Sequence, residues 1–173
     1  MGLPGSGKTT IGKLLSKELK ANFIDSDNHH SMKNIDKIKN GFPLNDFDRH
    51  DWLLSIKKKA NQSLKNQNVI IACSALKKKY RDFLSSLNFK LVYLKIDHDT
   101  AVKRIINRNN HFMPISLLKS QIEILEEPKK NTYFFLISHH PSMLLPTIKS
   151  RCFKVNLTNH NYNNFSDIIK TSK

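Results

Sequence analysis

The sequence has no apolar run long enough to cross a membrane, and its first residues are polar and rich in glycine. We therefore expect neither a transmembrane span nor a secretory signal peptide. Cysteine is scarce, because only Cys73 and Cys152 occur in 173 residues and they form no Cys-x-x-Cys pair. This usage is typical of a cytoplasmic protein with reduced thiols. With only 5 glycines and 6 prolines, the composition favours one globular domain over a disordered or fibrous chain.

Acidic residues are also scarce, since 14 Asp and Glu stand against 29 Lys and Arg, which gives a net charge of +15. A charge of this size is found in proteins that bind nucleic acid and in proteins that attract a small anionic substrate. The basic residues are mostly lysines spread along the chain, with no arginine-rich tail. Compositional drift towards Lys, Asn and Ile therefore explains the charge better than nucleic-acid binding does, and attraction of anions would be a by-product.

Apolar runs alternate with segments of helical periodicity along the chain. Strands are expected over residues 22–27, 68–75, 90–97, 132–138 and 153–158, and helices over 9–20, 31–39, 51–64, 76–87, 99–110, 115–128 and 163–173. Strands that alternate with helices build βαβ units, so the sequence predicts an α/β fold with a mostly parallel sheet.

A phosphate-binding motif stands at the start of the chain, where Gly2, Gly7, Lys8 and Thr9 complete the pattern G-x-x-x-x-G-K-[ST]. Its glycines let main-chain N–H groups surround a phosphate, its lysine adds a positive charge, and its hydroxyl reaches Mg²⁺. The amphipathic helix that follows is the context this motif requires. We therefore predict a nucleotide site formed by Gly2, Leu3, Pro4, Gly5, Ser6, Gly7, Lys8, Thr9 and Thr10.

Two acids, Asp25 and Asp27, end the first expected strand. Residues two apart on a strand face the same side, and the carboxyl ends of parallel strands are where substrates bind in open α/β sheets. One carboxylate can hold Mg²⁺ through water, and the other can deprotonate an attacking hydroxyl. Taken alone, a solvated turn explains the pair equally well, but the neighbouring phosphate motif favours catalysis.

Six segments, in this order and at natural spacing, resemble gluconokinase of the P-loop type, a relative of shikimate kinase and the nucleoside monophosphate kinases. They are GLPGSGKTTIGKLLSKEL, FIDSDNHH, NIDKIKNGFPLNDFDRHDWL, CSALKKKYRD, RIINRNNHFMP and LLKSQIEILEEP. The resemblance covers residues 1–128 and implies a P-loop NTPase fold with three α/β/α layers. It also implies transfer of the γ-phosphoryl group of ATP, with Mg²⁺, to the 6-hydroxyl of D-gluconate.

The resemblance assigns roles on the acceptor side of the site. Asp27 would bind the substrate hydroxyls and act as base, and His30 would lie near the substrate. Arg49 would form a bidentate pair with the gluconate carboxylate, a geometry that lysine reproduces poorly. Thr9 and Asp25 would hold the magnesium ion, Asp25 through water.

Further basic residues are candidates for contact with the substrate or the moving phosphoryl group. Lys77 and Arg81 follow the strand over 68–75, although a solvated basic face explains their neighbours nearly as well. Arg104 and Arg108 precede the segment NNHFMP, which resembles a lid whose arginines close over the phosphates and offset transition-state charge. With Lys8 and Asp27, these two arginines complete the predicted catalytic set.

The chain departs from this family in two places. The family has a strand before the phosphate loop, which here is reduced to its last residue, so we expect the central sheet to lack that strand and the loop to be untethered. After residue 128 the sequence instead resembles the delta-prime subunit of the DNA polymerase III clamp loader, with Ser138 and Arg151 in its nucleotide-sensing positions. We treat 1–128 as the kinase core and 129–173 as a tail that completes the same domain.

Three hypotheses follow from these resemblances. The first is an ATP-dependent gluconate kinase with a small-molecule substrate and, by analogy with its relatives, a homodimeric state. The second is an interaction fragment that joins clamp-loader subunits through the tail. The third is an inactive product of gene fusion.

Overall fold

The computed structural model describes residues 1–107, 114–128 and 132–136, the last of these by its backbone. The elements, in chain order, are α1 (Lys8–Glu18), β1 (Asn22–Asp25), η1 (Ser26–His29), α2 (Met32–Lys39), α3 (Asp46–Leu64), β2 (Val69–Ala72), α4 (Lys78–Leu84), η2 (Ser85–Leu87), β3 (Leu91–Lys95), α5 (His98–Ile106), α6 (Leu117–Glu123) and β4 (Thr132–Leu136). The alternation of strands and helices confirms the predicted α/β class. Within these ranges no helix is both long and apolar enough to cross a bilayer.

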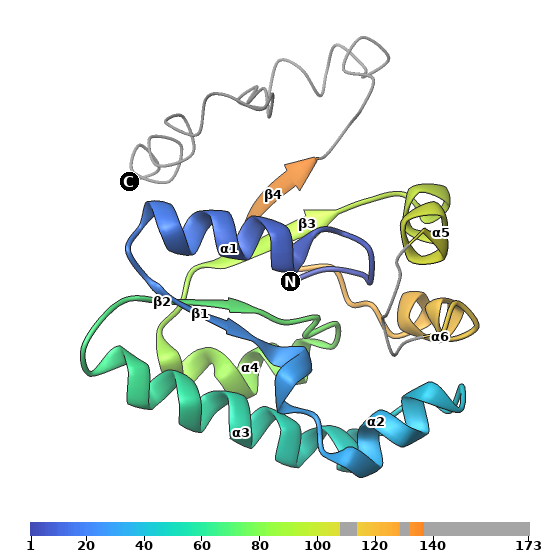
Figure 1. Ribbon diagram of the computed structural model, residues 1–173, viewed down its shortest axis with the longest axis horizontal. Coiled ribbons are helices and arrows are strands. Elements are labelled where there is room, and N and C mark those ends of the chain that lie inside the picture. Colours follow the sequence, from blue (N-terminus) through green and yellow to red (C-terminus); the bar gives the residue numbers. More distant parts are fainter. Residues whose placement is uncertain (108–113, 129–131, 137–173) are drawn as a thin grey trace, which may run out of the picture.

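The four described strands form two parallel pairs. Strand β1 pairs with β2, from Asn22 opposite Val69 to Asp25 opposite Ala72, and β3 pairs with β4 over five residues each. The strand expected in TYFFLIS is therefore present as β4. Strands β1, β2 and β3 point towards the same edge of the molecule, where α5, α6 and the start of α1 lie (Figure 1). The residues that follow each of these three strands therefore lie at the same edge.

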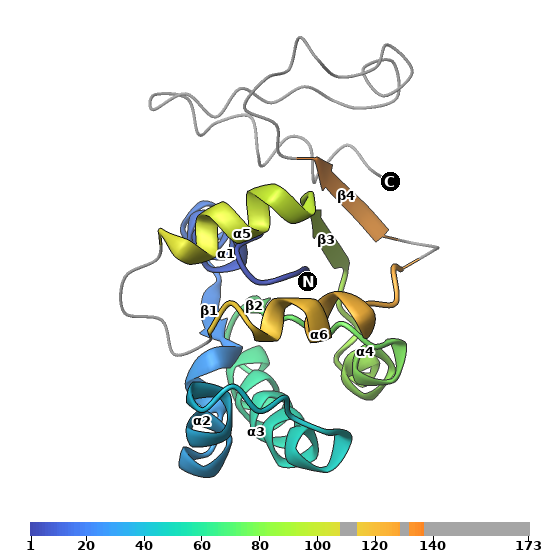
Figure 2. The same cartoon turned by 90° about the vertical axis from the view of Figure 1, so that its right-hand side faces the viewer.

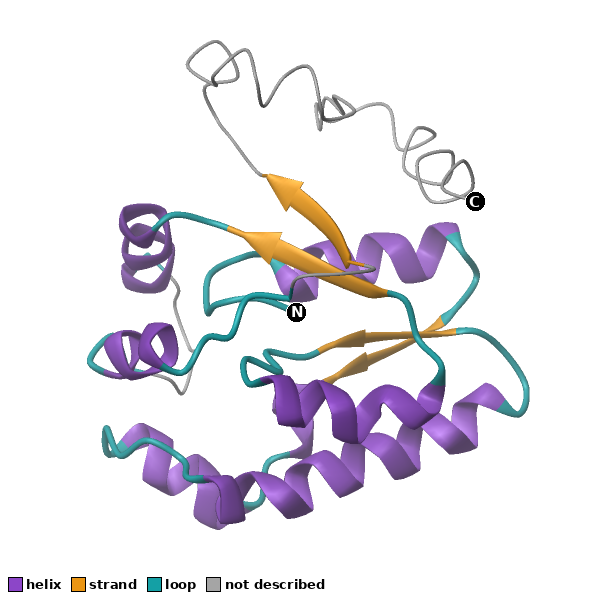
Figure 3. Cartoon of the chain, turned by 180° about the vertical axis from the view of Figure 1, so that it is seen from behind, coloured by secondary structure: helices purple, strands orange, loops and turns teal. Residues whose placement is uncertain are grey.

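Helices cover both faces of the strands, as the three-layer fold requires. Helix α1 lies against one face of β1 and β2, and α3 and α4 lie on the opposite face (Figure 3). On the α1 side, Ile11 and Leu15 pack with Leu94 of β3. On the other side, Ile24 and Tyr93 belong to a larger cluster with the apolar faces of α3 and α4. Both strand pairs contribute to both clusters, so they occupy one layer.

The two strand pairs are joined through the first residues of the chain, which lie between them (Figure 2). The carbonyl of Met1 accepts a hydrogen bond from the N–H of Leu94 in β3 at 2.9 Å. The N–H of Gly2 donates to the carbonyl of Ser74, just after β2, at 3.4 Å. The sheet is interrupted in its described part, as expected, but the expectation of an untethered phosphate loop is wrong because Met1 and Gly2 fix it to both pairs.

Two element boundaries differ from those expected, and each difference affects the site. Helix α3 begins at Asp46 instead of residue 51, because Asn45 and Asp48 form a capping box that starts the helix inside the expected turn. Strand β1 ends at Asp25 instead of residue 27, because the Asp25 carboxylate accepts a hydrogen bond from the N–H of Asp27 and caps a 3₁₀ turn. Asp25 and Asp27 therefore do not share a strand face.

Candidate active site

The phosphate loop, residues 2–7, leads directly into α1, as the motif predicts. Gly5 and Gly7 have φ values of 77° and 89°, in the left-handed region that glycine adopts without strain. The ammonium group of Lys8 donates to the carbonyls of Gly2 and Leu3 at 3.1 and 3.0 Å, so its side chain folds back over its own loop. Ser6 is fully buried and Thr10 is exposed, which leaves the main chain of the loop as the main phosphate-binding element.

Thr9 and Asp25 are brought together at the start of α1. The Thr9 hydroxyl donates to one Asp25 carboxylate oxygen at 2.9 Å, and the Asp27 N–H donates to the other at 3.2 Å. A hydroxyl and a carboxylate are the hard oxygen ligands that Mg²⁺ prefers, and Mg²⁺ usually takes only one or two protein ligands beside water and phosphate oxygens. This donor set fits the predicted ion.

Helix α5 lies beside the phosphate loop. The Arg104 guanidinium donates to the Gly5 carbonyl at 3.2 Å. A Cβ at Gly5 would lie 3.2 Å from the Ala101 carbonyl and 3.4 Å from the Arg104 Cβ, so glycine allows this close approach. The predicted partner Arg108 and the segment 108–113 lie outside the described residues, as do Ser138 and Arg151 of the tail.

His30 occupies a half-buried position against α3. Its ring stacks on the Trp52 ring with centroids 4.7 Å apart and an interplanar angle of 7°. The Trp52 indole N–H donates to the Ser26 carbonyl at 2.7 Å, which fixes the orientation of the Trp52 ring. Burial lowers the pKa of His30 to about 4, with the charge of Asp27 opposing the shift and that of Arg49 adding to it. His30 is therefore a neutral ring with both charged candidates nearby.

Arg49 is buried, with only 4% of its surface exposed. Its Nε–H donates to the Leu44 carbonyl at 3.3 Å, and its guanidinium carbon lies 5.6 Å from the centroid of the Tyr80 ring. Burial lowers the pKa of Arg49. Within the described part of the chain no residue accepts a hydrogen bond from its two terminal nitrogens, which fits a role in binding an anion.

Lys77 and Arg81 have protein partners in this structure. Lys77 donates to the Asp46 carboxylate at 2.9 Å. Arg81 is buried and donates through its terminal nitrogens to the carbonyls of Ala75, Leu76 and Glu126, at 2.7 to 2.9 Å. These bonds give Arg81 a structural function in joining the end of β2 to the segment after α6, and its contact with substrate stays a prediction.

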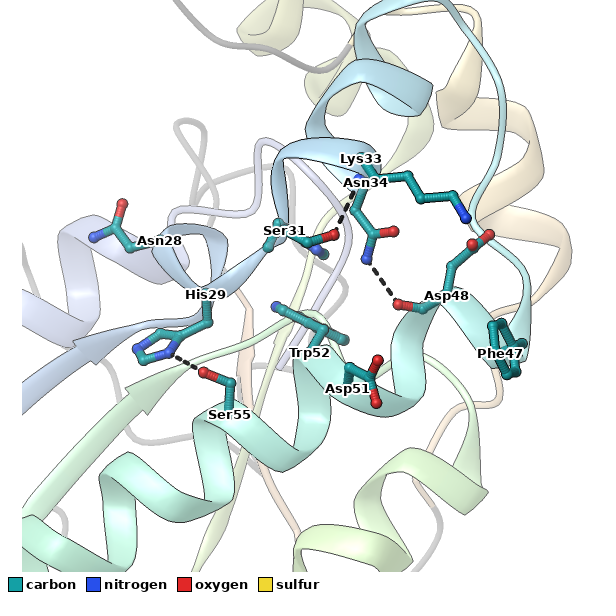
Figure 4. Close-up of a pocket in the computed structure, with 11 residues that line it drawn as sticks. Asn28, His29, Ser31, Lys33, Asn34, Phe47, Asp48, Asp51, Trp52 and Ser55 are labelled. Atoms are coloured by element: carbon teal, nitrogen blue, oxygen red, sulfur yellow. Dashed lines mark hydrogen bonds between the residues drawn. The ribbon is translucent and has the colours of Figure 1, made fainter.

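A cavity of about 340 Å³ lies between η1, α2 and the first turns of α3 (Figure 4). Its lining consists of Asn28, His29, His30, Ser31, Lys33, Asn34, Phe47, Asp48, Asp51, Trp52 and Ser55. Of the predicted substrate-binding residues, His30 alone lines it, and Asp27 and Arg49 do not. The stacked rings of His30 and Trp52 therefore belong to its wall, and the cavity is not the predicted acceptor site.

Sequence reasoning did not single out Asp46 and Tyr80. Tyr80 donates to Asp46 at 2.5 Å and carries the ring beside Arg49. Asp46 lies in PLNDFDR and Tyr80 in CSALKKKYRD, both within the segments that carry the family resemblance. Their membership of these segments could have pointed to both residues, whereas no spacing rule links residues that are 34 apart in the sequence.

Comparison with known proteins gives consistent relatives. The family model for shikimate kinase matches residues 4–141. The thermosensitive gluconokinase of Escherichia coli strain K12 is 47% identical over 133 residues, which cover 75% of this chain and 71% of that protein. Two solved structures, each 36% identical, share the fold: an unliganded sugar kinase from Janibacter sp. HTCC2649, with a TM-score of 0.72 over 79% of this chain and 81% of that one, and a gluconokinase from Sinorhizobium meliloti 1021, with a TM-score of 0.68 over 78% of each.

Proposed function

Because this chain belongs to the gluconokinase family of shikimate kinase-like P-loop proteins, we propose that it transfers the γ-phosphoryl group of ATP to the 6-hydroxyl of D-gluconate. The products are ADP and 6-phospho-D-gluconate. The observation that carries the proposal is the 2.9 Å hydrogen bond from Thr9 to Asp25, which joins the phosphate loop to the acidic segment ending at Asp27. A nucleotide-binding loop and a candidate base thereby lie at one edge of the sheet.

On the nucleotide side, main-chain N–H groups of the phosphate loop and of the first turn of α1 bind the phosphates, except at Pro4, which has none, and at Gly2 and Ser6, whose N–H groups donate within the protein. Lys8 exchanges its two loop carbonyls for phosphate oxygens. Thr9 and Asp25 would hold Mg²⁺, Asp25 through water, and the ion would supply positive charge that offsets the charge of the phosphates. Arg104, already beside Gly5, adds a second positive charge near the loop. These residues stabilise the charge that develops during transfer.

On the acceptor side, Asp27 accepts the proton of the 6-hydroxyl group. The hydroxyl oxygen bonds to the γ-phosphorus while the bond between that phosphorus and the departing ADP oxygen breaks. Arg49 binds the carboxylate at the other end of the acceptor. The lowered pKa of His30 keeps its ring uncharged near neutral pH, so it does not compete with Arg49 for the carboxylate.

The test is ADP release in a coupled assay with a panel of sugar acids. We expect Mg²⁺-dependent turnover with gluconate, reduced at least about 10²-fold by Lys8→Ala or Asp27→Asn because each removes a group that acts in the transition state. Asp99→Asn, at an exposed carboxylate on α5, is the matched control and should retain activity. A folded wild-type chain that phosphorylates none of the sugar acids would refute the proposal.

The alternative of a clamp-loader interaction fragment depends on Ser138 and Arg151. Both residues lie outside the described part of the chain, so the alternative stays a prediction. Retention of clamp-loader subunits on the immobilised chain, lost on Arg151→Ala, would favour it over the kinase.

A further inference from the structure

A hydrogen-bonded cluster joins the first turn of α3 to the first turn of α4. The Asp46 carboxylate accepts from the Tyr80 hydroxyl at 2.5 Å, from Lys79 at 2.5 Å and from Lys77 at 2.9 Å. Hydrogen bonds from these three donors, that of Lys79 most of all, hold the pKa of Asp46 well below its usual range. Asp46 is therefore an anion bonded to both helix starts.

Tyr80 connects this cluster to the buried arginine. Burial, followed by the bond to Asp46, raises the pKa of Tyr80, so its hydroxyl stays protonated and donates. Its ring lies 5.6 Å from the Arg49 guanidinium carbon and 5.8 Å from the Lys77 ammonium. The guanidinium has one other described contact, from Nε to the Leu44 carbonyl at 3.3 Å. Two described contacts therefore orient the Arg49 guanidinium, one with the Tyr80 ring and one with the Leu44 carbonyl.

We propose that Asp46 and Tyr80 are positioning residues that hold Arg49 in place for the carboxylate of the acceptor. The inference rests on the proposed function, because it requires an acidic acceptor. Asp46 fixes the Tyr80 hydroxyl, the fixed ring supports the guanidinium by a cation–π contact, and the terminal nitrogens remain available. Asp46 also holds the ammonium group of Lys77 in an ion pair, whereas the terminal nitrogens of Arg49 can select the acid over an uncharged polyol.

Tyr80→Phe tests this arrangement, because it keeps the ring and removes only the bond to Asp46. We expect KM for gluconate to rise roughly three- to tenfold, the loss expected for one hydrogen bond of ordinary net strength, while KM for ATP and kcat stay within about twofold. The preference for gluconate over glucitol, which lacks the carboxylate, should fall by the same factor. Asp46→Asn should act in the same direction.

Lys78→Ala is the matched control, since Lys78 lies on the same turn of α4 and pairs with Asp82 instead of Asp46. Its kinetic constants should equal those of the wild type. Equal increases in KM for ATP and in KM for both acceptors in Tyr80→Phe would overturn the inference, because they would indicate a general effect on folding.

A second measurement separates this inference from the proposed function. Hydrogen exchange at the Arg49 Nε–H, assigned in NMR spectra by comparison with Arg49→Lys, should be several-fold faster in Tyr80→Phe than in the wild type. An unchanged exchange rate overturns the positioning inference even if the enzyme is active. Faster exchange in a chain that phosphorylates no sugar acid would support the fixing of Arg49 by Tyr80 but would refute the proposed function.

Discussion

His30 shows how one residue links the site to the stability of the fold. Its ring is held against Trp52, and burial lowers its pKa from 6.5 to about 4. Between these two values the unfolded chain binds more protons at this position than the folded chain does. The free energy of unfolding contributed by His30 is therefore complete above pH 6.5 and decreases as the pH falls towards 4.

We predict that His30→Gln makes the free energy of unfolding less sensitive to acid. For a pKa of 6.5 unfolded and about 4 folded, the wild type should lose about 2 kcal/mol from this residue between pH 7.5 and pH 5. His30→Gln should lack that part of the decrease. The loss of ring stacking lowers its free energy of unfolding at both pH values and therefore does not change the difference between them. Urea unfolding at the two pH values measures the difference.

The control for this experiment is His98→Gln, at an exposed histidine on α5. It should decrease in stability with acid as the wild type does. Parallel decreases in the wild type and His30→Gln would contradict the prediction.

At the residue scale, the sequence predicted contacts between residues that lie close together in the chain or belong to a known motif. The Thr9–Asp25 contact joins the two residues of the predicted magnesium pair, because Thr9 lies at the start of α1 and Asp25 at the end of the next strand, β1. The bonds from Lys77 to Asp46 and from Arg81 to the Glu126 carbonyl were not predictable, since each joins residues more than 30 apart in the sequence. Chemistry identified these side chains as donors, but only the fold determines which acceptors they meet.

At the scale of elements, the first turn of α3 determines the position of Arg49. The Asn45 side chain accepts from the Asp48 N–H at 2.8 Å, and the Asp48 carboxylate accepts from the Asn45 N–H at 3.1 Å. Asp48 also pairs with Lys37 of α2 at 2.8 Å, which lowers the pKa of its carboxyl. The capping box therefore both starts α3 and attaches it to α2.

We predict that Asn45→Ala reduces the free energy of unfolding by about 1 kcal/mol, the usual cost of losing an N-cap side chain. Asn61→Ala makes the same change at an exposed position inside α3, where alanine is the better helix former, and should be neutral or slightly stabilising. Urea unfolding of both variants provides the comparison. Equal effects of the two substitutions would show that the box contributes nothing specific.

The helices and strands themselves were largely predictable, because their apolar spacing is regular. The start of α3 was not, since Gly41, Pro43 and Asn45 suggest a turn, and only the reciprocal Asn45–Asp48 bonds extend the helix into it. The end of β1 was misplaced for a similar reason. Asp25 uses its side chain to cap the next turn, a local hydrogen bond that competes with continued strand structure.

For the whole molecule, the phosphate loop lies where the two strand pairs meet. Gly2 has a φ of 152°, and a Cβ there would lie 2.6 Å from the Leu94 carbonyl of β3 and 2.8 Å from the Ser6 hydroxyl. Its N–H reaches Ser74 after β2. The spacing of the strand pairs and the shape of the loop therefore depend on the same residue.

We predict that Gly2→Ala lowers both the free energy of unfolding and the protection of the fold by ATP. Gly41→Ala is the matched control, because Gly41 also has a positive φ, of 77°, but its nearest neighbour would be the Ser116 hydroxyl at 3.6 Å. The control should lose about 1–2 kcal/mol for the left-handed backbone, and Gly2→Ala should lose about 1–3 kcal/mol more from steric overlap.

Since the overlap at Gly2 displaces either β3 or the loop, the rise in melting temperature with ATP and Mg²⁺ should also shrink in Gly2→Ala and persist in Gly41→Ala. Equal stability losses and equal ATP protection in the two variants would show that nucleotide binding does not depend on how the strand pairs meet.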